Sequence, residues 1–199
     1  FIREIKPVGG FSNESYFHNV FIVDNVLYVR QAGKGLLKLD KDLVEVKNGY
    51  FFSDMGIFNI RNYKGKVEIL SVDNGIYLYN KGEIQHIPIP CLSTAKVRGA
   101  LSLNDGNLCI FTNNNGVFVI DSLYHEYAHF SSQNGLISDK ISSAINDIYG
   151  NIWTAGENGI HYIAYNSSIM LFNRSFNLPG KIHCVAKKDN ILFVASSSG

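Results

Sequence analysis

The chain has few of the residues that mark the common metal, redox and membrane classes. Its 199 residues include only 3 cysteines, 4 prolines, 2 methionines and 1 tryptophan. The cysteines are widely spaced and form no CxxC pair, which excludes a zinc ribbon and a thioredoxin-type motif. No apolar run approaches the roughly 20 residues that a membrane-spanning helix needs.

An excess of charge is also lacking. The 18 basic and 17 acidic residues leave a formal net charge of +1, which gives no electrostatic reason to bind nucleic acid or an anionic membrane surface. We therefore expect no nucleic-acid partner and no membrane contact by this segment. There is no G-x-S-x-G nucleophile elbow and no P-loop. The sequence predicts no catalytic residue, no cofactor and no metal site, and the segment itself is not expected to be an enzyme.

The three cysteines are interpreted as small hydrophobic residues of the core. Cys109 lies between Leu108 and Ile110 in an apolar run, and Cys184 has a similar setting. Cys91 is the third. A disulfide between two of them stays open as an alternative and would suit an oxidising compartment such as the periplasm.

What the chain does contain is a repeat of about 40 residues. The fullest copy, Asn134 to Ile163, has three short apolar segments separated by turns that carry Gly or Asn. Weaker copies place a corresponding glycine at intervals of 40, 41, 43 and 40 residues: Gly35, Gly75, Gly116, Gly159 and Gly199. A period of about 40–45 residues with four short strands per period is typical of propeller blades.

We therefore predict an all-β fold, a β-propeller of about four full four-stranded blades plus a partial fifth. Residues 1–199 form one propeller segment, with blades over 12–47, 56–89, 97–131 and 141–173 and a partial blade over 182–199. A helix over Leu36–Lys47 is the competing interpretation, and the register of the repeat argues against it. Phe1–Ile5 is expected to be an outer strand. The incomplete last blade, with its unpaired edge, favours a fragment of a larger ring over closure as five blades.

The fourth copy also carries a family resemblance. It contains Asn134-Gly135-Leu136, then Asp147-Ile148-Tyr149-Gly150-Asn151-Ile152-Trp153, then Glu157-Asn158-Gly159-Ile160. These residues resemble the repeat of two-component regulator propellers. The third copy shares part of the pattern, with Asp105-Gly106-Asn107 and Asn115-Gly116-Val117. Such repeats form the periplasmic sensor region of bacterial membrane receptors, often hybrid histidine kinases of Bacteroidetes.

This resemblance implies a periplasmic, non-catalytic module that senses a ligand for a two-component-type signalling receptor. The ligand it implies is an oligosaccharide or another small molecule, whose binding changes the geometry of a receptor dimer. Adjacent propeller or receptor domains would be the other partners, and a histidine kinase would lie elsewhere in the parent protein. Two alternatives stay open. One is a propeller scaffold for protein–protein interaction, and the other is a propeller enzyme, a lyase or glycosidase.

One motif points to a different chemistry. His125-Glu126-Tyr127-Ala128-His129 fits H-E-x-x-H, which binds zinc when a helix places both histidines on one face. Here the motif falls in the expected outer strand of the third blade. In a strand, residues four apart are separated by about 13 Å and cannot share one zinc ion. We interpret this segment as a solvated outer strand.

Candidate ligand-binding residues come from the loops at one face of the propeller, because loops are free of the packing constraints of the core. The expected loops are 48–56, 89–96, 131–140 and 174–181. The candidates are Tyr50, Gln133, Asn134, Asp139, Lys140, Glu157 and Lys181 from loops and turns, and Arg98 and His183 from inner strands. Asp139, Glu157 and His183 are also the scattered candidates for an enzyme. Trp153 is expected to pack in the core.

Overall fold

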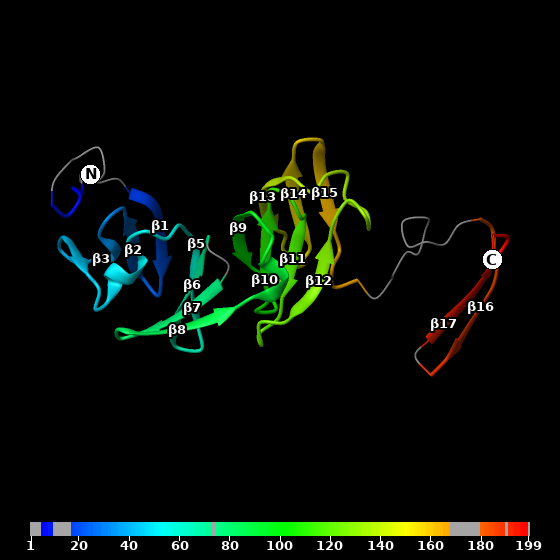
Figure 1. The fold of residues 1–199 in the computed structure, drawn as a ribbon, viewed down its shortest axis with the longest axis horizontal. Helices are drawn as coiled ribbons and strands as arrows, with labels where there is room; N and C mark the ends of the chain where they lie inside the picture. The colour runs from blue at the N-terminus through cyan, green and yellow to red at the C-terminus, as the bar shows by residue number, and fades with distance from the viewer. Residues whose placement is uncertain (1–4, 10–16, 73–74, 168–179, 190, 199) are drawn as a thin grey trace.

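The chain is built of short antiparallel strands that form a row of small sheets (Figure 1). The computed structural model describes residues 5–9, 17–72, 75–167, 180–189 and 191–198. Three four-stranded sheets are followed by a three-stranded sheet and a two-stranded hairpin. Each of the first four sheets is one propeller blade, so the predicted all-β propeller is confirmed.

Every blade is a meander of strands that are consecutive in sequence. Blade one contains β1 (Phe17–Val23), β2 (Val26–Gln31), β3 (Gly35–Leu39) and β4 (Leu43–Glu45). Blade two contains β5 (Ile57–Tyr63), β6 (Lys66–Ser71), β7 (Gly75–Asn80) and β8 (Glu83–Pro88). Blade three contains β9 (Val97–Ser102), β10 (Leu108–Thr112), β11 (Val117–Ile120) and β12 (Glu126–Phe130).

Blade four contains β13 (Ile141–Asn146), β14 (Ile152–Gly156) and β15 (Gly159–Ile163). The final hairpin is β16 (Ile182–Lys188) and β17 (Ile191–Ser196). Two short 3₁₀ helices, η1 (Gly49–Phe52) and η2 (Pro90–Leu92), lie in the connections between blades.

The first two strands of every repeat share one irregularity. The pairs Phe17↔Gln31, Ile57↔Ser71, Val97↔Thr112, Ile141↔Gly156 and Ile182↔Ser196 are each followed by a register shift. In each case one extra residue on the first strand is a bulge, which bends the strand and increases its twist. The bulge therefore gives all five copies the same register and identifies structurally equivalent positions.

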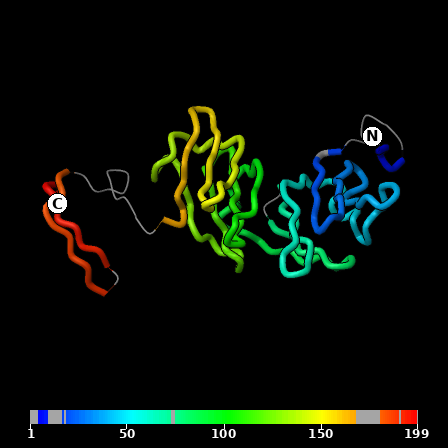
Figure 2. Tube along the Cα trace, turned by 180° about the vertical axis from the view of Figure 1, so that it is seen from behind, coloured from blue at the N-terminus to red at the C-terminus, as the bar shows by residue number. Residues whose placement is uncertain are grey.

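The first strands line the centre of the arrangement. β1 contacts β5, β5 contacts β9, and β9 contacts β13, so neighbouring blades meet through their inner strands. In both Figure 1 and Figure 2, blade one lies at one end of the row of blades, and blades three and four lie together toward the other end.

The core is divided among the interfaces between blades. One cluster joins blades one and two through Leu36 and Phe52 against Ile69. A second joins Leu70 and Ile76 of blade two to Leu108 and Ile110 of blade three. A third joins blades three and four and includes Cys109 and Ile152. Because these faces are buried against a neighbouring blade, much of the core of each blade depends on its neighbour.

Several expectations need correction. The strand expected over 141–148 ends at Asn146, because Asp147 begins a turn in which its carboxylate accepts hydrogen bonds from the backbone N–H groups of Tyr149 and Asn151. Trp153 is 41% exposed and not packed in the core. The competing helix over 36–47 is wrong, since β3 and β4 occupy it. The strand expected within 169–172, the outer strand of blade four, lies outside the described residues, as do residues 1–4 and the loop residues 174–179.

The cysteines also differ from expectation. All three are free thiols: Cys109 is buried, Cys91 is partly buried and Cys184 is exposed. Burial raises the pKa of Cys109 to about 12, so its thiol stays protonated and unreactive near neutral pH. The prediction of a buried small hydrophobe is confirmed for Cys109 and is wrong for Cys184, whose side chain is exposed on the hairpin.

Candidate functional site: an aromatic groove between the first two blades

A groove of about 630 Å³ lies where the connection after blade one crosses the outer part of blade two. One wall comes from Asn48 and from Tyr50 and Phe51 of η1. The other comes from β7 and β8, chiefly Tyr77 and His86. Tyr50 is 69% exposed and Phe51 is 47% exposed, so both rings are open to a ligand.

The aromatic wall is fixed from below by a buried arginine. Arg30 on β2 is 4% exposed and donates from Nη2 to the carbonyl of Ser53 at 2.5 Å and from Nε to that of Phe52 at 3.4 Å. Phe51 makes edge-to-face contacts with Phe52 at 5.1 Å and Tyr77 at 5.5 Å between ring centroids. These contacts make the wall a rigid part of the scaffold, although η1 belongs to a connection.

Blades two and three carry equivalent histidine pairs that differ in one respect. His86 stacks on Tyr77 across the β7–β8 pair with ring centroids 4.8 Å apart, and His129 stacks on Phe118 at 4.1 Å. Nε2 of His129 is 2.7 Å from the carbonyl oxygen of Asn115. His86 lines the groove, and no described residue makes a hydrogen bond of this kind to its ring. His86 can therefore hydrogen-bond a ligand.

Gly75 makes room for His86. A Cβ atom at position 75 would lie 2.3 Å from Nε2 of the His86 ring, closer than any real contact. The glycine that marks the start of β7 in the repeat thus also permits the histidine to lie flat against the sheet.

The chemistry of the groove suits a neutral ligand. None of its lining residues is Asp, Glu, Lys or Arg, and the exposed groups are aromatic faces and a small number of polar atoms. Asn48 donates from Nδ2 to the carbonyl of Gly82 at 2.8 Å, which ties the connection to the β7–β8 turn. An apolar groove with a few fixed polar groups is the usual form of a small-molecule site.

The structure places the sequence candidates in separate regions. Tyr50 lies in the groove, whereas Lys140 and Glu157 form an exposed ion pair with Nζ and Oε1 3.1 Å apart. Arg98 is exposed on β9. Lys181 and His183 are exposed on the separate hairpin.

The remaining candidates shape the loop over 131–140. Asn134 accepts a hydrogen bond from the backbone N–H of Ser131 at 2.6 Å and donates to the carbonyl of His129 at 2.7 Å. Asp139 accepts hydrogen bonds from the N–H of Ser132 at 2.6 Å and its hydroxyl at 2.8 Å. Gln133 is exposed.

His161 is a residue that sequence analysis missed. It is 8% exposed; Nε2 accepts from the N–H of Ile137 at 3.0 Å, and Nδ1 is 3.2 Å from the hydroxyl of Thr154. An accepting Nε2 places the proton of a neutral ring on Nδ1. The side chain therefore holds the loop over 131–140 against blade four. Its position two residues after Gly159, on the buried side of β15, could have been derived from strand alternation.

The H-E-x-x-H segment is a strand, as predicted. β12 begins at Glu126; His125 is close to Asp121, with Nδ1 and Oδ2 3.8 Å apart, while His129 stacks on Phe118. Among the described residues, no group of three or more His, Cys, Asp or Glu side chains could hold a metal ion.

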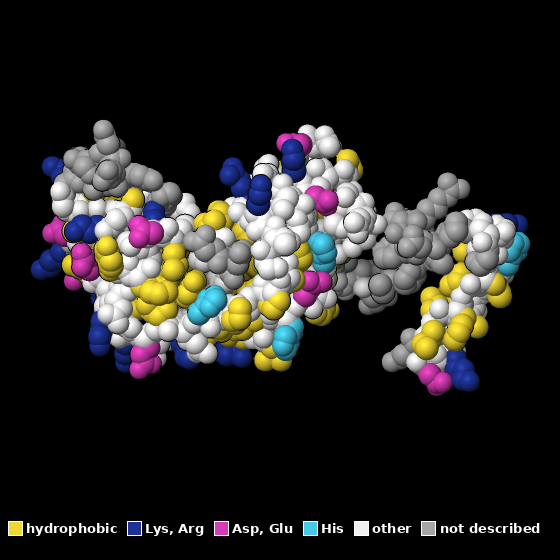
Figure 3. Space-filling model, in the orientation of Figure 1, with side chains coloured by type: hydrophobic (Ala, Val, Ile, Leu, Met, Phe, Trp, Pro, Cys, Tyr) yellow, Lys and Arg dark blue, Asp and Glu magenta, His cyan; other side chains and the backbone are white. Residues whose placement is uncertain are grey.

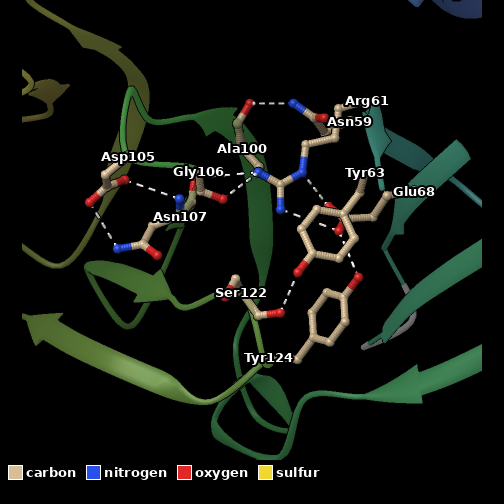
Figure 4. Close-up of polar contacts among 10 residues, drawn as sticks. All are labelled: Asn59, Arg61, Tyr63, Glu68, Ala100, Asp105, Gly106, Asn107, Ser122 and Tyr124. Carbon is tan, nitrogen blue, oxygen red and sulfur yellow. Dashed lines mark hydrogen bonds and ion pairs between the residues drawn. The ribbon is translucent and has the colours of Figure 1, made fainter. Parts of the chain in front are cut away.

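A second polar cluster lies between blades two and three (Figure 4). Nε and Nη2 of Arg61 donate to the two carboxylate oxygens of Glu68, at 2.5 and 3.2 Å. Tyr124 donates to the same carboxylate at 2.8 Å, and Nη1 of Arg61 donates to the carbonyl of Gly106 at 3.2 Å. Glu68 is 2% exposed and surrounded by donors. This cluster joins blades two and three, and a substrate cannot reach the Glu68 carboxylate.

Tyr124 provides a test of this cluster. Burial, then the negative charge of Glu68, raises the pKa of Tyr124 above 10.0. As the pH rises past 10.0, the unfolded chain loses this proton before the folded protein does. The free energy of unfolding therefore falls above pH 10, and Tyr124→Phe should make this fall shallower. Urea unfolding at pH values on either side of 10 measures this fall in the free energy of unfolding. Tyr149→Phe, which changes an exposed tyrosine outside the cluster, is the control. Equal slopes for wild type and Tyr124→Phe would contradict the expectation.

The arrangement of blades and the groove define a β-propeller with an aromatic groove on its side. No family model matches the sequence, and no curated protein matches it. Solved structures of similar fold exist. The extracellular domain of BT4673 from B. thetaiotaomicron, assigned to the hybrid two-component systems, is 20% identical with a TM-score of 0.58, over 97% of this chain and 30% of that one.

Two further structures share the fold. The extracellular domain of BT3049 from B. thetaiotaomicron, assigned to the same class, is 21% identical with a TM-score of 0.53, over 86% of this chain and 24% of that one. Virginiamycin B lyase from Staphylococcus aureus is 12% identical with a TM-score of 0.60, over 96% of this chain and 75% of the lyase. At these identities the likeness establishes the fold, and it agrees with the predicted resemblance to two-component sensor propellers.

The chain spans about 30% of the length of the solved BT4673 extracellular domain. In the described part of the chain, no helix has the length and apolar character needed to cross a membrane.

Proposed function

We propose that this propeller segment is the extracytoplasmic, ligand-sensing part of a two-component-type signalling receptor. The observation that carries the proposal is the groove itself: the exposed rings of Tyr50 and Phe51 line it together with His86, whose ring nitrogens have no hydrogen-bond partner among the described residues. The similarity in fold to the extracellular domains of BT4673 and BT3049 supports the location and the receptor context.

The ligand proposed is a neutral oligosaccharide. Its hydroxyl groups would bond to His86 and Asn48, and its less polar faces would pack on the rings of Tyr50 and Phe51. The uncharged lining of the groove disfavours an acidic or basic ligand, because a charge moved from water into an apolar groove needs a partner there.

Sensing requires that the ligand distinguish two receptor states. The groove lies between the η1 connection of blade one and the outer strands of blade two, so a bound saccharide contacts both blades. In a dimeric receptor whose two states differ slightly at this blade interface, the saccharide would favour one state. Adjacent receptor domains would transmit this preference to a kinase elsewhere in the parent protein.

A thermal-shift titration with neutral oligosaccharides tests the proposal. A ligand that binds only the folded protein stabilises it by RT ln(1 + [L]/Kd), so the melting temperature should rise with concentration. Tyr50→Ala and His86→Ala should each weaken binding by about tenfold or more, equivalent to about 1.4 kcal/mol. Tyr149→Ala, which removes an exposed ring outside the groove, should leave the shift unchanged. A saccharide shift that survives both groove variants would overturn the assignment of the site.

The enzyme alternative has less support. The carboxylate of Asp139 is bonded to Ser132 and that of Glu157 is paired with Lys140, so both have structural partners and neither is placed beside His183. The likeness to virginiamycin B lyase concerns the fold.

A further inference from the structure

Blade four presents an uncovered apolar face. Ile145, Trp153 and Ile160 are 65%, 41% and 70% exposed, and with Ala155 they line a hollow of about 250 Å³. The opposite face of the same sheet is packed against blade three through Ile141 and Ile152. An apolar surface of this kind marks an interaction site.

The β16–β17 hairpin presents a matching surface. Ile182, Val185 and Leu192 are 41%, 57% and 45% exposed. Hydrophobic side chains run along the hairpin in Figure 3, and the hairpin lies apart from the four blades in Figures 1 and 2. A two-stranded hairpin without a partner surface is at best marginally stable in water.

We propose that this hairpin packs on the open face of blade four as the inner half of a fifth blade. The repeated bulge gives the correspondence: Ile182↔Ser196 in the hairpin is equivalent to Ile141↔Gly156 in blade four and to Val97↔Thr112 in blade three. The first residues of these pairs, at 97, 141 and 182, are 44 and 41 residues apart, as the repeat requires.

The equivalences define which side chains meet. Blade three uses Leu101, Cys109 and Phe111 to cover Ile141 and Ile152 of blade four. Counted from the bulge, the blade-four equivalents of these three blade-three residues are Ile145, Trp153 and Ala155. These are the side chains that line the hollow on the exposed face of blade four. The hairpin residues equivalent to Ile141, Ala144 and Ile152 are Ile182, Val185 and Leu192. Both halves of the missing interface are thus present in this chain.

The connection has the required length. Between the third strand of a blade and the first strand of the next lie 17 residues after β3, 16 after β7 and 20 after β11. The corresponding number after β15 is 18. The chain is therefore long enough to bring β16 to the same position beside β13.

The single tryptophan is a built-in reporter of this contact. In the full chain, a docked hairpin should shift Trp153 emission to shorter wavelength and slow its quenching by acrylamide, because Trp153 would become as buried as the equivalent Cys109. Leu192→Asp places a charge in the interface and should release the hairpin. Acrylamide should then quench Trp153 as it quenches a side chain that is 41% exposed. Phe193→Asp, on the opposite face of the same strand, is the matched control and should leave Trp153 protected.

Val185→Asp should reproduce the effect of Leu192→Asp, and unchanged far-ultraviolet circular dichroism in each variant shows that the blades remain folded. Equal quenching in wild type, Leu192→Asp and Phe193→Asp would overturn the proposal. Protection of Trp153 that disappears on dilution would also overturn it, because the hairpin of a second copy would then be the occupant.

Discussion

Replacing Arg61 by leucine is expected to destabilise the protein by about 3–5 kcal/mol, because it leaves the Glu68 carboxylate buried without its ion-pair partner. Glu68 is 2% exposed and Arg61 is 12% exposed, so water cannot replace the lost charge. The effect should appear in chemical unfolding as a lower midpoint with an unchanged slope.

A double-mutant cycle separates the cost of the orphaned charge from the value of the pair. The Arg61→Leu/Glu68→Leu protein should be more stable than Arg61→Leu alone, because well-packed apolar residues replace a buried pair at little cost. The cycle is cleanest in a Tyr124→Phe background, which removes the phenol that also donates to Glu68. Lys140→Ala is the exposed counterpart and should change stability by only about 0–1 kcal/mol. A double mutant no more stable than Arg61→Leu would contradict this account.

The second large effect is expected at Gly35. Its φ is +88°, and a Cβ atom would lie 2.1 Å from the carbonyl oxygen of Gly49, in the connection that carries η1. Gly35→Ala combines strain in the left-handed region with a clash against backbone, so we expect a loss of about 3 kcal/mol or more. It should also weaken ligand binding, since the wall containing Tyr50 must move.

Gly33→Ala is the matched control for this substitution. Gly33 also has a positive φ, +68°, but no atom lies within 4 Å of the place that a Cβ atom would take there. It should cost about 1–2 kcal/mol from backbone strain alone. Equal losses at the two positions would show that the contact with Gly49 contributes nothing.

Much of the fold could be predicted from the sequence because the turns of each repeat carry glycine at a regular spacing. The spacing of Gly35, Gly75, Gly116 and Gly159 locates the start of the third strand or the turn before it in every blade, and short alternating runs supply the strands. The predicted blades over 12–47, 56–89 and 97–131 each contain a complete sheet. Strand ends were less predictable: Ile148 is apolar, yet the Asp147 turn ends β13 at Asn146 and leaves Ile148 85% exposed.

The groove could be predicted only in part. Tyr50 was found because it lies in a connection between blades, where ligand sites are common. His86 was missed because it lies within β8, and its role depends on two facts that no local pattern contains. Among the described residues, no contact holds its ring as Asn115 holds the equivalent His129, and the η1 connection from blade one lies beside it. Sites formed by residues distant in sequence require the tertiary arrangement.

The bulge shared by the inner strands has a consequence for how such a protein can diversify. The extra residue has no partner across the strand pair, so the backbone register is the same whatever its side chain. In three of the copies that residue is exposed and is Arg98, Ser142 or His183, a cation, a small hydroxyl and an imidazole, whereas in blade two it is Phe58, which packs against the core. Where the bulge residue is exposed, as in these three copies, mutation can change the surface chemistry while the hydrogen-bonded ladder is preserved, and new specificities can arise there at little structural risk.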